Sequence, residues 1–379
     1  MAVQHGYGKI AGTDALVFAY DTGDTRNSYK GEPTVNIAAD LGLTDLGAGL
    51  TYLGVEDGWK KYSMSGTWSG GSYPYSMALN AVTFTGGQPY SVVATLKTNV
   101  ENKFNYFCTS GISYVNAPKD YEGTLSATLN PDGSRTVRRV NFAYTSTTGQ
   151  LGYLFTNPVS GITFNSATDF VWVKEYQAEQ KTHPTQFVNG TRSATQGLLD
   201  VAGGKTIDLT SVSFDANADI EFDGTNDVIL APSGFPSSVS EYTIEYVARL
   251  DSAARMPIAS YSNTAFYKYG DYSWYYTHGG SAAEFYYPNG GGYITGWGHW
   301  VITYDGSNVK VYRNNSYLGA QASSGTADFS QGWRIGYWSS GGGYAWDGKI
   351  PVVKIYTRAL TQAEVTNNYK FYKNRFTLP

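Results

Sequence analysis

Short runs in which apolar and polar residues alternate occur along most of the chain, and this period-2 pattern is that of strands with one buried face. In residues 309–312, Val309 and Val311 fall on one side and Lys310 and Tyr312 on the other. Similar β-rich runs lie at residues 90–96, 170–173, 242–247 and 300–304. Because such runs are short and numerous, they predict an all-β protein.

Tight turns separate these runs. Asp-Gly pairs, in which glycine supplies the positive φ of a hairpin turn, occur five times. They are Asp57-Gly58, Asp132-Gly133, Asp223-Gly224, Asp305-Gly306 and Asp347-Gly348. Strands of this length joined by glycine-rich turns are typical of sandwiches, so we predict two β-sandwich domains of the jelly-roll type.

One helix is indicated near the end of the chain. Thr361 and Glu364 have the spacing of a capping box, in which each side chain bonds the backbone of the other. Leu360 and Val365 are placed to form a hydrophobic staple across it. The helix should run to about Phe371 and pack its apolar residues onto a sheet.

Three segments follow from these patterns. Residues 1–34 contain a polar, turn-rich stretch and are expected to form an N-terminal arm. Residues 35–188 are predicted to be a first β domain, and residues 189–379 a second one closed by the helix. A polar stretch broken by Pro184 marks the crossing between the two domains.

Composition narrows the function. Charged residues make up 15% of the 379-residue chain, against about 25% in an average soluble protein. Long amphipathic helices need charged outer faces, so this composition argues against a helical bundle or an α/β enzyme. The net charge is −4 and no run of Lys and Arg occurs, so we expect no nucleic-acid partner. No window approaches the roughly 20 apolar residues of a membrane span, so no membrane insertion is expected. Residues 1–12 lack the basic start and apolar core of a secretory signal.

Three stretches of the second domain resemble the laminin-G-like branch of the concanavalin A-like lectin fold. They are Phe222-Asp-Gly-Thr-Asn-Asp-Val-Ile, Trp297-Gly-His-Trp-Val-Ile-Thr-Tyr-Asp-Gly, and Trp346-Asp-Gly-Lys-Ile-Pro-Val-Val-Lys-Ile-Tyr-Thr-Arg-Ala-Leu-Thr-Gln-Ala-Glu-Val. The resemblance implies a two-sheet jelly roll with a concave face that often meets glycans.

The first domain is similar to carbohydrate-binding-module jelly rolls, through Gly58-Trp-Lys-Lys-Tyr, Tyr90-Ser-Val-Val-Ala and Asp169-Phe-Val-Trp-Val-Lys-Glu-Tyr-Gln-Ala-Glu. Gln186-Phe-Val-Asn-Gly-Thr-Arg-Ser and Leu16-Val-Phe-Ala-Tyr-Asp resemble structural proteins of tailed bacteriophages. That resemblance implies a virion component. A lectin-like chain without a secretory signal fits a particle that is assembled in the host cytoplasm and released by lysis, and it also fits an intracellular lectin.

Aromatic residues are concentrated in one stretch, where they fill 14 of the 40 positions 261–300, against 16% of the whole chain. Consecutive aromatics on a strand face opposite sides, so some rings must meet solvent or a partner. Outward rings suit stacking on sugar C–H faces, a protein–protein interface, or an ordinary surface. The predicted ligand or interface residues are Tyr269, Tyr272, Trp274, Tyr276, Tyr287 and Tyr293.

Sequence patterns that would indicate a metal site or a catalytic site are weaker than the aromatic pattern. The lectin resemblance implies that Ca²⁺ could bind loop carboxylates, with Asp223 and Asp227 as candidates, but the same residues suit a hairpin turn. No other metal site and no catalytic residues are predicted. The nearest acid pair, Glu241 and Glu245, would lie about 13 Å apart on a strand. Glycoside hydrolysis needs acids about 5–9.5 Å apart.

The sequence therefore predicts a non-catalytic virion protein displayed on a phage particle, as capsid decoration, fibre or tail accessory. Expected partners are capsid or tail subunits, further copies of the same chain, and host-surface glycans. A free carbohydrate-binding lectin is the first alternative. A glycan hydrolase or depolymerase is the second.

Overall fold

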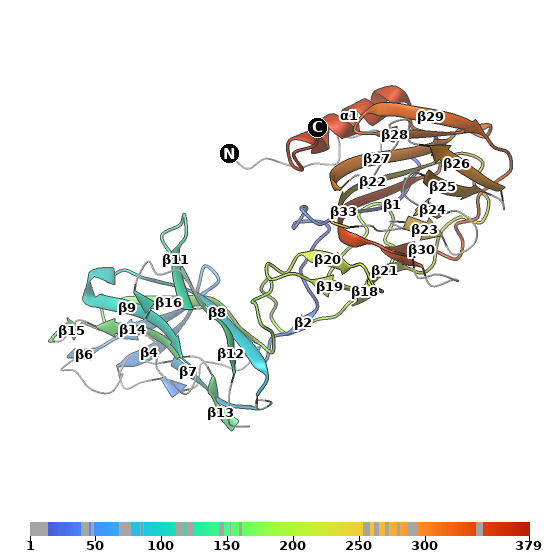
Figure 1. Ribbon diagram of the computed structural model, residues 1–379. Helices are drawn as coiled ribbons and strands as arrows, with labels where there is room; N and C mark the ends of the chain where they lie inside the picture. The colour runs from blue at the N-terminus through green and yellow to red at the C-terminus, as the bar shows by residue number, and fades with distance from the viewer. Residues whose placement is uncertain are drawn as a thin grey trace. The chain divides into compact units, whose positions relative to one another are not determined.

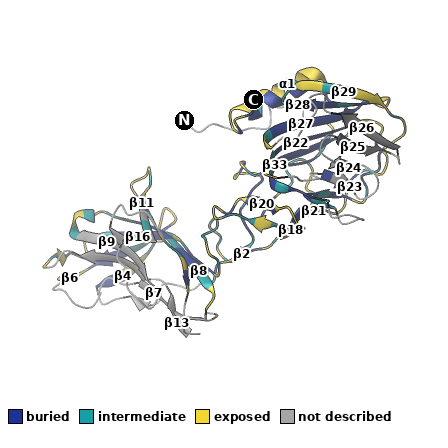
Figure 2. Cartoon of the chain, viewed as in Figure 1, coloured by how far each residue is buried: buried dark blue, intermediate teal, exposed yellow. Residues whose placement is uncertain are grey.

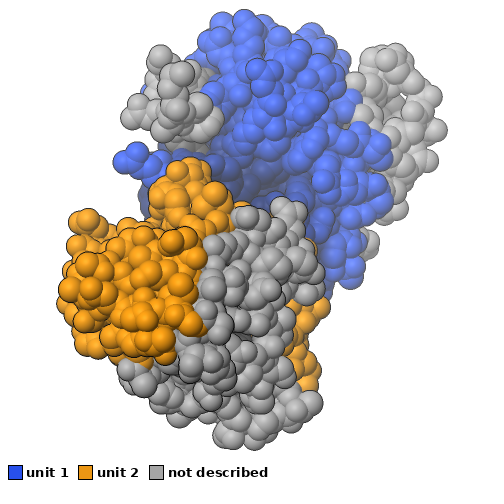
Figure 3. Space-filling model, turned by 90° about the vertical axis from the view of Figure 1, so that its left-hand side faces the viewer, with its two compact units in different colours: residues 1–33, 193–215, 219–379 blue, residues 34–192, 216–218 orange. Residues whose placement is uncertain are grey.

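The computed structural model describes residues 14–38, 45–46, 49–67, 77–83, 85, 87–110, 117–118, 125–143, 148–151, 153–158, 161–252, 258–260, 265–269, 273–278, 281–286, 295–338 and 344–379. The chain divides into two compact units, coloured separately in Figure 3. Unit 1 consists of residues 1–33, 193–215 and 219–379, and unit 2 of residues 34–192 and 216–218. Within the described ranges, no helix is long and apolar enough to cross a membrane.

Unit 1 is built on two antiparallel sheets (Figure 1). The eight-stranded sheet has the order β19 (Ser213–Phe214), β20 (Ile220–Asp223), β33 (Asp347–Tyr356), β22 (Tyr242–Leu250), β27 (Gly296–Tyr304), β28 (Asn308–Arg313) and β29 (Ser316–Ala322), with β1 (Leu16–Asp21) also paired to β33. The seven-stranded sheet has the order β18 (Asp208–Ser211), β21 (Val228–Ala231), β30 (Trp333–Ile335), β23 (Ile258–Ser260), β24 (Ala265–Tyr269), β25 (Ser273–His278) and β26 (Ser281–Tyr286). A separate pair joins β31 (Tyr337–Trp338) to β32 (Tyr344–Ala345).

One apolar core lies between the two sheets. Ile244 and Tyr246 reach it from β22, and Trp333 and Ile335 reach it from β30. Because both sheets contribute to a single buried cluster, unit 1 is a β-sandwich, and the all-β prediction is confirmed. The central strands of the eight-stranded sheet are almost wholly buried, as the dark blue of β22, β27 and β33 in Figure 2 shows.

The structure corrects the predicted N-terminal arm. Residues 16–21 form β1, which pairs antiparallel with β33, and Phe18 and Tyr20 are fully buried in the core of unit 1. The apolar run from Leu16 to Tyr20 is a strand whose partner, β33, lies near the other end of the chain. The chain passes from unit 1 to unit 2 after residue 33 and returns to unit 1 after residue 192. The sequence predicts these domain boundaries after residues 34 and 188.

Helix α1 (Gln362–Lys373) begins where the sequence predicts. The side chain of Thr361 accepts a hydrogen bond from the Glu364 amide, and the Glu364 carboxylate accepts one from the Thr361 amide at 2.8 Å. Leu360 and Val365 share one buried cluster, which confirms the staple. Figure 1 shows α1 along the outside of the eight-stranded sheet, where Tyr369 and Tyr372 pack on Val247 and Val352.

An ion pair reinforces this cap. Arg358 donates hydrogen bonds of 2.9 and 2.6 Å to the two carboxylate oxygens of Glu364. These bonds lower the pKa of Glu364 to about 2. A carboxylate whose folded pKa is depressed stabilises the fold above its unfolded pKa, and this stabilisation is lost as the pH falls through the folded value.

We therefore expect Glu364→Gln to cost about 0.5–1 kcal/mol of unfolding free energy at neutral pH, after allowance for solvent screening. Glutamine keeps the capping bond but not the charge. The gap to the wild type should shrink as the pH falls from 4.5, the ordinary pKa of a glutamate, towards the folded pKa of about 2. Urea unfolding at several pH values measures this gap, with Glu241→Gln as the exposed control. A gap that does not change with pH would contradict the ion pair.

Unit 2 contains one large sheet and several small ones. The six-stranded sheet has the order β11 (Leu125–Leu129), β12 (Arg135–Ala143), β8 (Pro89–Thr98), β16 (Phe170–Glu179), β5 (Trp59–Met64) and β4 (Leu50–Glu56). The small sheets are β10 (Ala117–Pro118), β9 (Phe104–Ser110) and β14 (Tyr153–Pro158); β13 (Thr148–Leu151), β7 (Met77–Thr83) and β3 (Asp45–Leu46); β15 (Thr163–Phe164) with β6 (Gly66–Thr67); and β17 (Thr191–Arg192) with β2 (Thr34–Val35). A short 3₁₀ turn spans Glu101–Lys103.

Three of the five predicted Asp-Gly hairpin turns are confirmed, those at residues 57–58, 132–133 and 305–306. Asp223-Gly224 forms a turn that leads from one sheet to the other and not a hairpin. Between β4 and β5, Asp57 and Gly58 take φ of 51° and 78°, the positive pair that a two-residue hairpin needs. The prediction for Asp347-Gly348 is wrong because both residues lie inside β33. At Gly348, with φ 129°, a Cβ atom would lie 2.2 Å from the carbonyl oxygen of Arg249. Glycine is required there by the close approach of β22.

Candidate functional site

Three strands formed by described residues of the aromatic stretch, β24, β25 and β26, are neighbours at one end of the seven-stranded sheet. Of the six predicted ligand residues, Tyr269 lies on β24, and Trp274 and Tyr276 lie on β25. Tyr272, Tyr287 and Tyr293 lie outside the described residues.

Backbone register divides these strands into two faces. Ile258 of β23 is fully buried in the core and pairs with Phe266, which pairs in turn with Tyr276. Since alternate residues share a face, Tyr276 and Trp274 occupy register positions on the core face. Tyr269 occupies the opposite face. The structure thus divides the three described candidates between two faces of one sheet.

Three further tyrosines share the face of Tyr269. Tyr267 pairs with Tyr275, while Tyr269 pairs with Ser273 and Ser273 with Tyr286. We call Tyr267, Tyr269, Tyr275 and Tyr286 the outer tyrosine face. Sequence reasoning missed three of the four, because the parity of each strand is known only once its pairing to a core residue such as Ile258 is known.

The calcium candidates form a turn between β20 and β21. The carboxylate of Asp227 accepts hydrogen bonds from the Asp223 amide at 2.9 Å and from the Ser213 hydroxyl at 3.1 Å. Asp223 accepts one from the Thr225 amide at 2.8 Å. Burial raises the pKa of Asp227. These bonds form a tight turn that leads from β20 in the eight-stranded sheet to β21 in the seven-stranded sheet. Among the residues that the structure describes, no three His, Cys, Asp or Glu side chains are grouped to hold a metal.

Glu241 and Glu245, the acid pair considered for catalysis, do not face a common cleft. Glu241 is exposed, whereas Glu245 lies fully buried between β22 and α1. The Glu245 carboxylate lies 2.8 Å from Nε2 of His299, 2.8 Å from Nδ2 of Asn368 and 3.8 Å from Nζ of Lys354. These four buried residues form a closed polar cluster that substrate cannot reach.

The charges within this buried cluster balance one another. Burial opposes ionisation of Glu245, but the Lys354 ammonium and the hydrogen bonds from His299 and Asn368 outweigh it and lower the pKa of that carboxyl. Burial lowers the pKa of Lys354, and the charge of Glu245 opposes that shift. The arrangement stabilises a covered charge pair beneath α1 and serves the fold of unit 1.

Comparison with protein families confirms the resemblance of the second domain. Residues 222–366 match the model of the concanavalin A-like lectin/glucanases superfamily. These residues form a concanavalin A-like lectin domain. The matched residues include the outer tyrosine face, the Asp223–Asp227 turn and three of the four residues of the buried cluster, with Asn368 just beyond them, because the match ends within α1.

Several solved binding domains of toxins are similar at low identity. The binding domain of Paraclostridial Mosquitocidal Protein 1 is 15% identical with a TM-score of 0.38, over 47% of this chain and 50% of that chain. The receptor binding domain of botulinum neurotoxin D is 13% identical with a TM-score of 0.37, over 48% and 51%. The botulinum neurotoxin serotype G binding domain is 18% identical with a TM-score of 0.38, over 47% and 49%. The match thus spans about half of each solved chain, and no curated protein matches the sequence.

Proposed function

We propose that this protein is a non-catalytic, glycan-binding component of a bacteriophage particle, with the outer tyrosine face as its sugar-binding surface. The observation that carries the glycan-binding part is the placement of four tyrosines on one face of three neighbouring strands within a lectin domain. Tyrosine rings stack on the apolar C–H faces of sugars, and their hydroxyls exchange hydrogen bonds with sugar hydroxyls.

The test of this surface is the double variant Tyr267→Ala/Tyr275→Ala, which removes the directly paired tyrosines at its centre. Retention on immobilised host-surface glycans should fall at least about tenfold because two stacking rings are lost. The unfolding midpoint should stay within a few degrees of the wild type, since both positions lie opposite the core face.

Tyr317→Ala is the matched control. Tyr317 lies on β29 of the other sheet, and 55% of its surface is exposed. Equal retention by the control and the double variant would contradict a sugar site on the outer tyrosine face. Retention lost only after Trp274→Ala/Tyr276→Ala would instead place the ligand on the core-face positions.

The virion part of the proposal is supported by the resemblance of residues 16–21 and 186–193 to phage structural proteins. Display on a particle also suits weak sites, because many linked copies raise avidity without new contacts. Capsid or tail subunits would be the partners, and further copies of the chain would complete a homo-oligomer.

Electron microscopy of particles labelled through a C-terminal tag tests this location. Label at regular positions on the particle is the expected result. Unlabelled particles, together with glycan binding by the free monomer, would favour the free lectin instead. New reducing ends after incubation with host capsule would establish a depolymerase and overturn the non-catalytic assignment.

A further inference from the structure

Unit 2 presents a second, chemically different surface, which goes beyond the proposed function of the lectin domain. Trp172 of β16 pairs directly with Lys61 of β5 on one side and with Lys97 of β8 on the other. The residues that alternate with them, including Val171 and Leu96, belong to the buried core of the unit. Trp172 and its two lysine neighbours therefore lie on the outer face of the six-stranded sheet.

Ammonium groups and aromatic rings are interleaved on this face. Nζ of Lys61 lies 4.3 Å from the ring centre of Phe170 and 5.4 Å from that of Trp172. Nζ of Lys97 lies 4.4 Å from the ring centre of Trp59 and 5.4 Å from that of Trp172. We call Trp59, Lys61, Lys97, Phe170 and Trp172 the lysine–aromatic surface. Phe170 and Trp172 are half-buried, so part of each ring meets solvent.

The central ring is held in a fixed orientation. The indole Nε1 of Trp172 donates a 2.7 Å hydrogen bond to Oε2 of Glu56, and the rings of Trp172 and Phe170 lie 5.7 Å apart. The same carboxylate pairs with Lys61 at 3.3 Å. A ring held in this way loses little freedom when a ligand stacks on it, which favours binding.

The cations of this face are only partly balanced. Lys61 has Glu56 as its acid, whereas Lys97 has no acid within 4 Å in the part of the chain that the structure describes. Cation–π contacts at exposed sites are weak, and lysine has a flexible stem, so both ammonium groups can turn from the rings towards an anion. Neighbouring strands lie about 4.8 Å apart, so Lys61 and Lys97 flank Trp172 across about 10 Å.

We propose that the lysine–aromatic surface binds an acidic polysaccharide whose sugar rings carry carboxylates. The sugar faces would stack on Trp172 and Phe170, and the carboxylates would accept hydrogen bonds from Lys61 and Lys97. A neutral glycan would leave the cations unused. A polyphosphate carries one or more negative charges on every unit. Glu56 on this face and the net charge of −4 on the chain would repel so dense an anion.

Binding of oligogalacturonate to the full chain, measured by calorimetry, tests the proposal. We expect saturable binding that weakens as NaCl is raised, and no comparable binding of neutral dextran or of a DNA oligonucleotide. Lys61→Ala and Lys97→Ala should each weaken binding about tenfold, because each removes one charge-assisted hydrogen bond.

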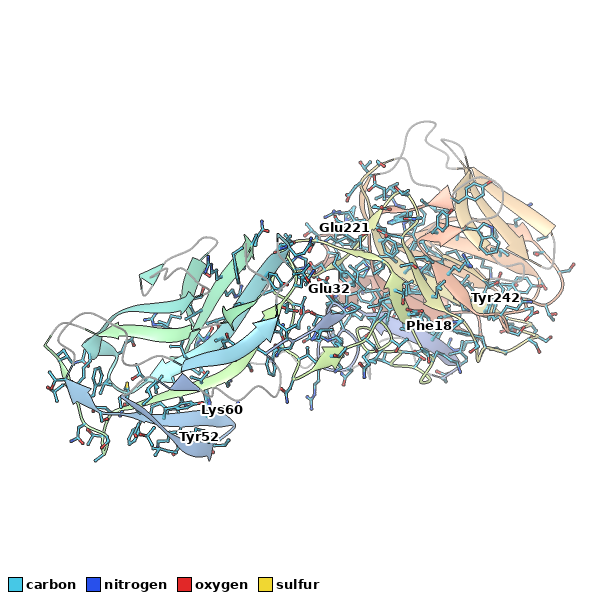
Figure 4. All side chains as sticks on the ribbon, turned by 90° about the horizontal axis from the view of Figure 1, so that it is seen from below. Phe18, Glu32, Tyr52, Lys60, Glu221 and Tyr242 are labelled. Carbon is cyan, nitrogen blue, oxygen red and sulfur yellow. The ribbon has the colours of Figure 1, made fainter. Side chains whose placement is uncertain are left out.

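Lys60→Ala is the matched control, since it removes the same charge at the neighbouring position of β5, labelled in Figure 4. The side chain of Lys60 is exposed, and consecutive residues of a strand face opposite sides. Equal losses from Lys60→Ala and Lys61→Ala would overturn the proposal, as would DNA or dextran bound as tightly as oligogalacturonate, or no saturable binding at all. Failure here leaves the outer tyrosine face untouched, because its variants lie in unit 1 and are read out on host-surface glycans.

Discussion

Replacing Glu245 with alanine should lower the free energy of unfolding of unit 1 by about 3–5 kcal/mol. The variant removes the carboxylate that faces Lys354 and His299 in a place that solvent does not reach, with Lys354 only 1% exposed. A buried charge that loses its partner keeps its full desolvation cost. Native-state hydrogen exchange of the β22 and β27 amides at pH 7 measures the unfolding free energy of this unit.

The double variant Glu245→Met/Lys354→Met provides the control for that prediction. It removes both charges and fills their volume with apolar groups, so it should be much more stable than Glu245→Ala and close to the wild type. Glu241→Ala removes an exposed carboxylate four residues earlier in the chain, just before β22, and should cost less than about 0.5 kcal/mol. Equal small losses from Glu245→Ala and Glu241→Ala would show that the buried cluster does not stabilise unit 1.

The second large effect is expected at the N-terminal strand. Phe18→Ala should cost unit 1 about 3–5 kcal/mol, because it empties a fully buried position in the core. The Phe18 ring contacts those of Tyr20 at 6.0 Å and Phe235 at 5.8 Å, so the cavity opens inside an aromatic cluster. Thermal unfolding followed by calorimetry should show a lower midpoint for unit 1.

Thr25→Ala is the control for this variant, since Thr25 is an exposed residue of the turn after β1. It should leave the midpoint within about a degree of the wild type. If Phe18→Ala also left unfolding of the isolated protein unchanged, residues 16–21 would be the detachable arm that the sequence predicts, and their pairing with β33 would contribute nothing to stability.

Local signals predicted the elements whose physics is local. The capping box at Thr361 and Glu364 fixes the start of α1 through bonds between residues three apart, so no distant contact is needed to find it. Asp57-Gly58 selects its hairpin in the same way. The concanavalin A-like domain was also recognisable, because each of its three motifs is a continuous run of residues. The first spans β20, a turn and β21, the second lies on β27 and the turn after it, and the third runs from β33 into α1.

Sites that depend on pairing across the sheets were not predictable. The six aromatic candidates share one sequence stretch, yet register places Tyr269 and Trp274 on opposite faces of their sheet. Lys61, Lys97 and Trp172 come from three separate strands, and only strand pairing brings them into one row. From the sequence, a carboxylate that alternates with apolar residues on a strand, such as Glu245, is expected to face solvent. Only the tertiary structure shows that α1 covers it.

By itself the sequence determined the strand-rich fold class, most of the turns, the capped helix and the concanavalin A-like fold of residues 222–366, since each depends on neighbouring residues and short periods. Only the tertiary structure decided that residues 16–21 complete a sheet, that Asp347-Gly348 lies within a strand, and that Glu245 is buried beside Lys354. The physical reason is the same in each case: a strand has two equivalent faces and two open edges, and its distant partners decide which of them are covered.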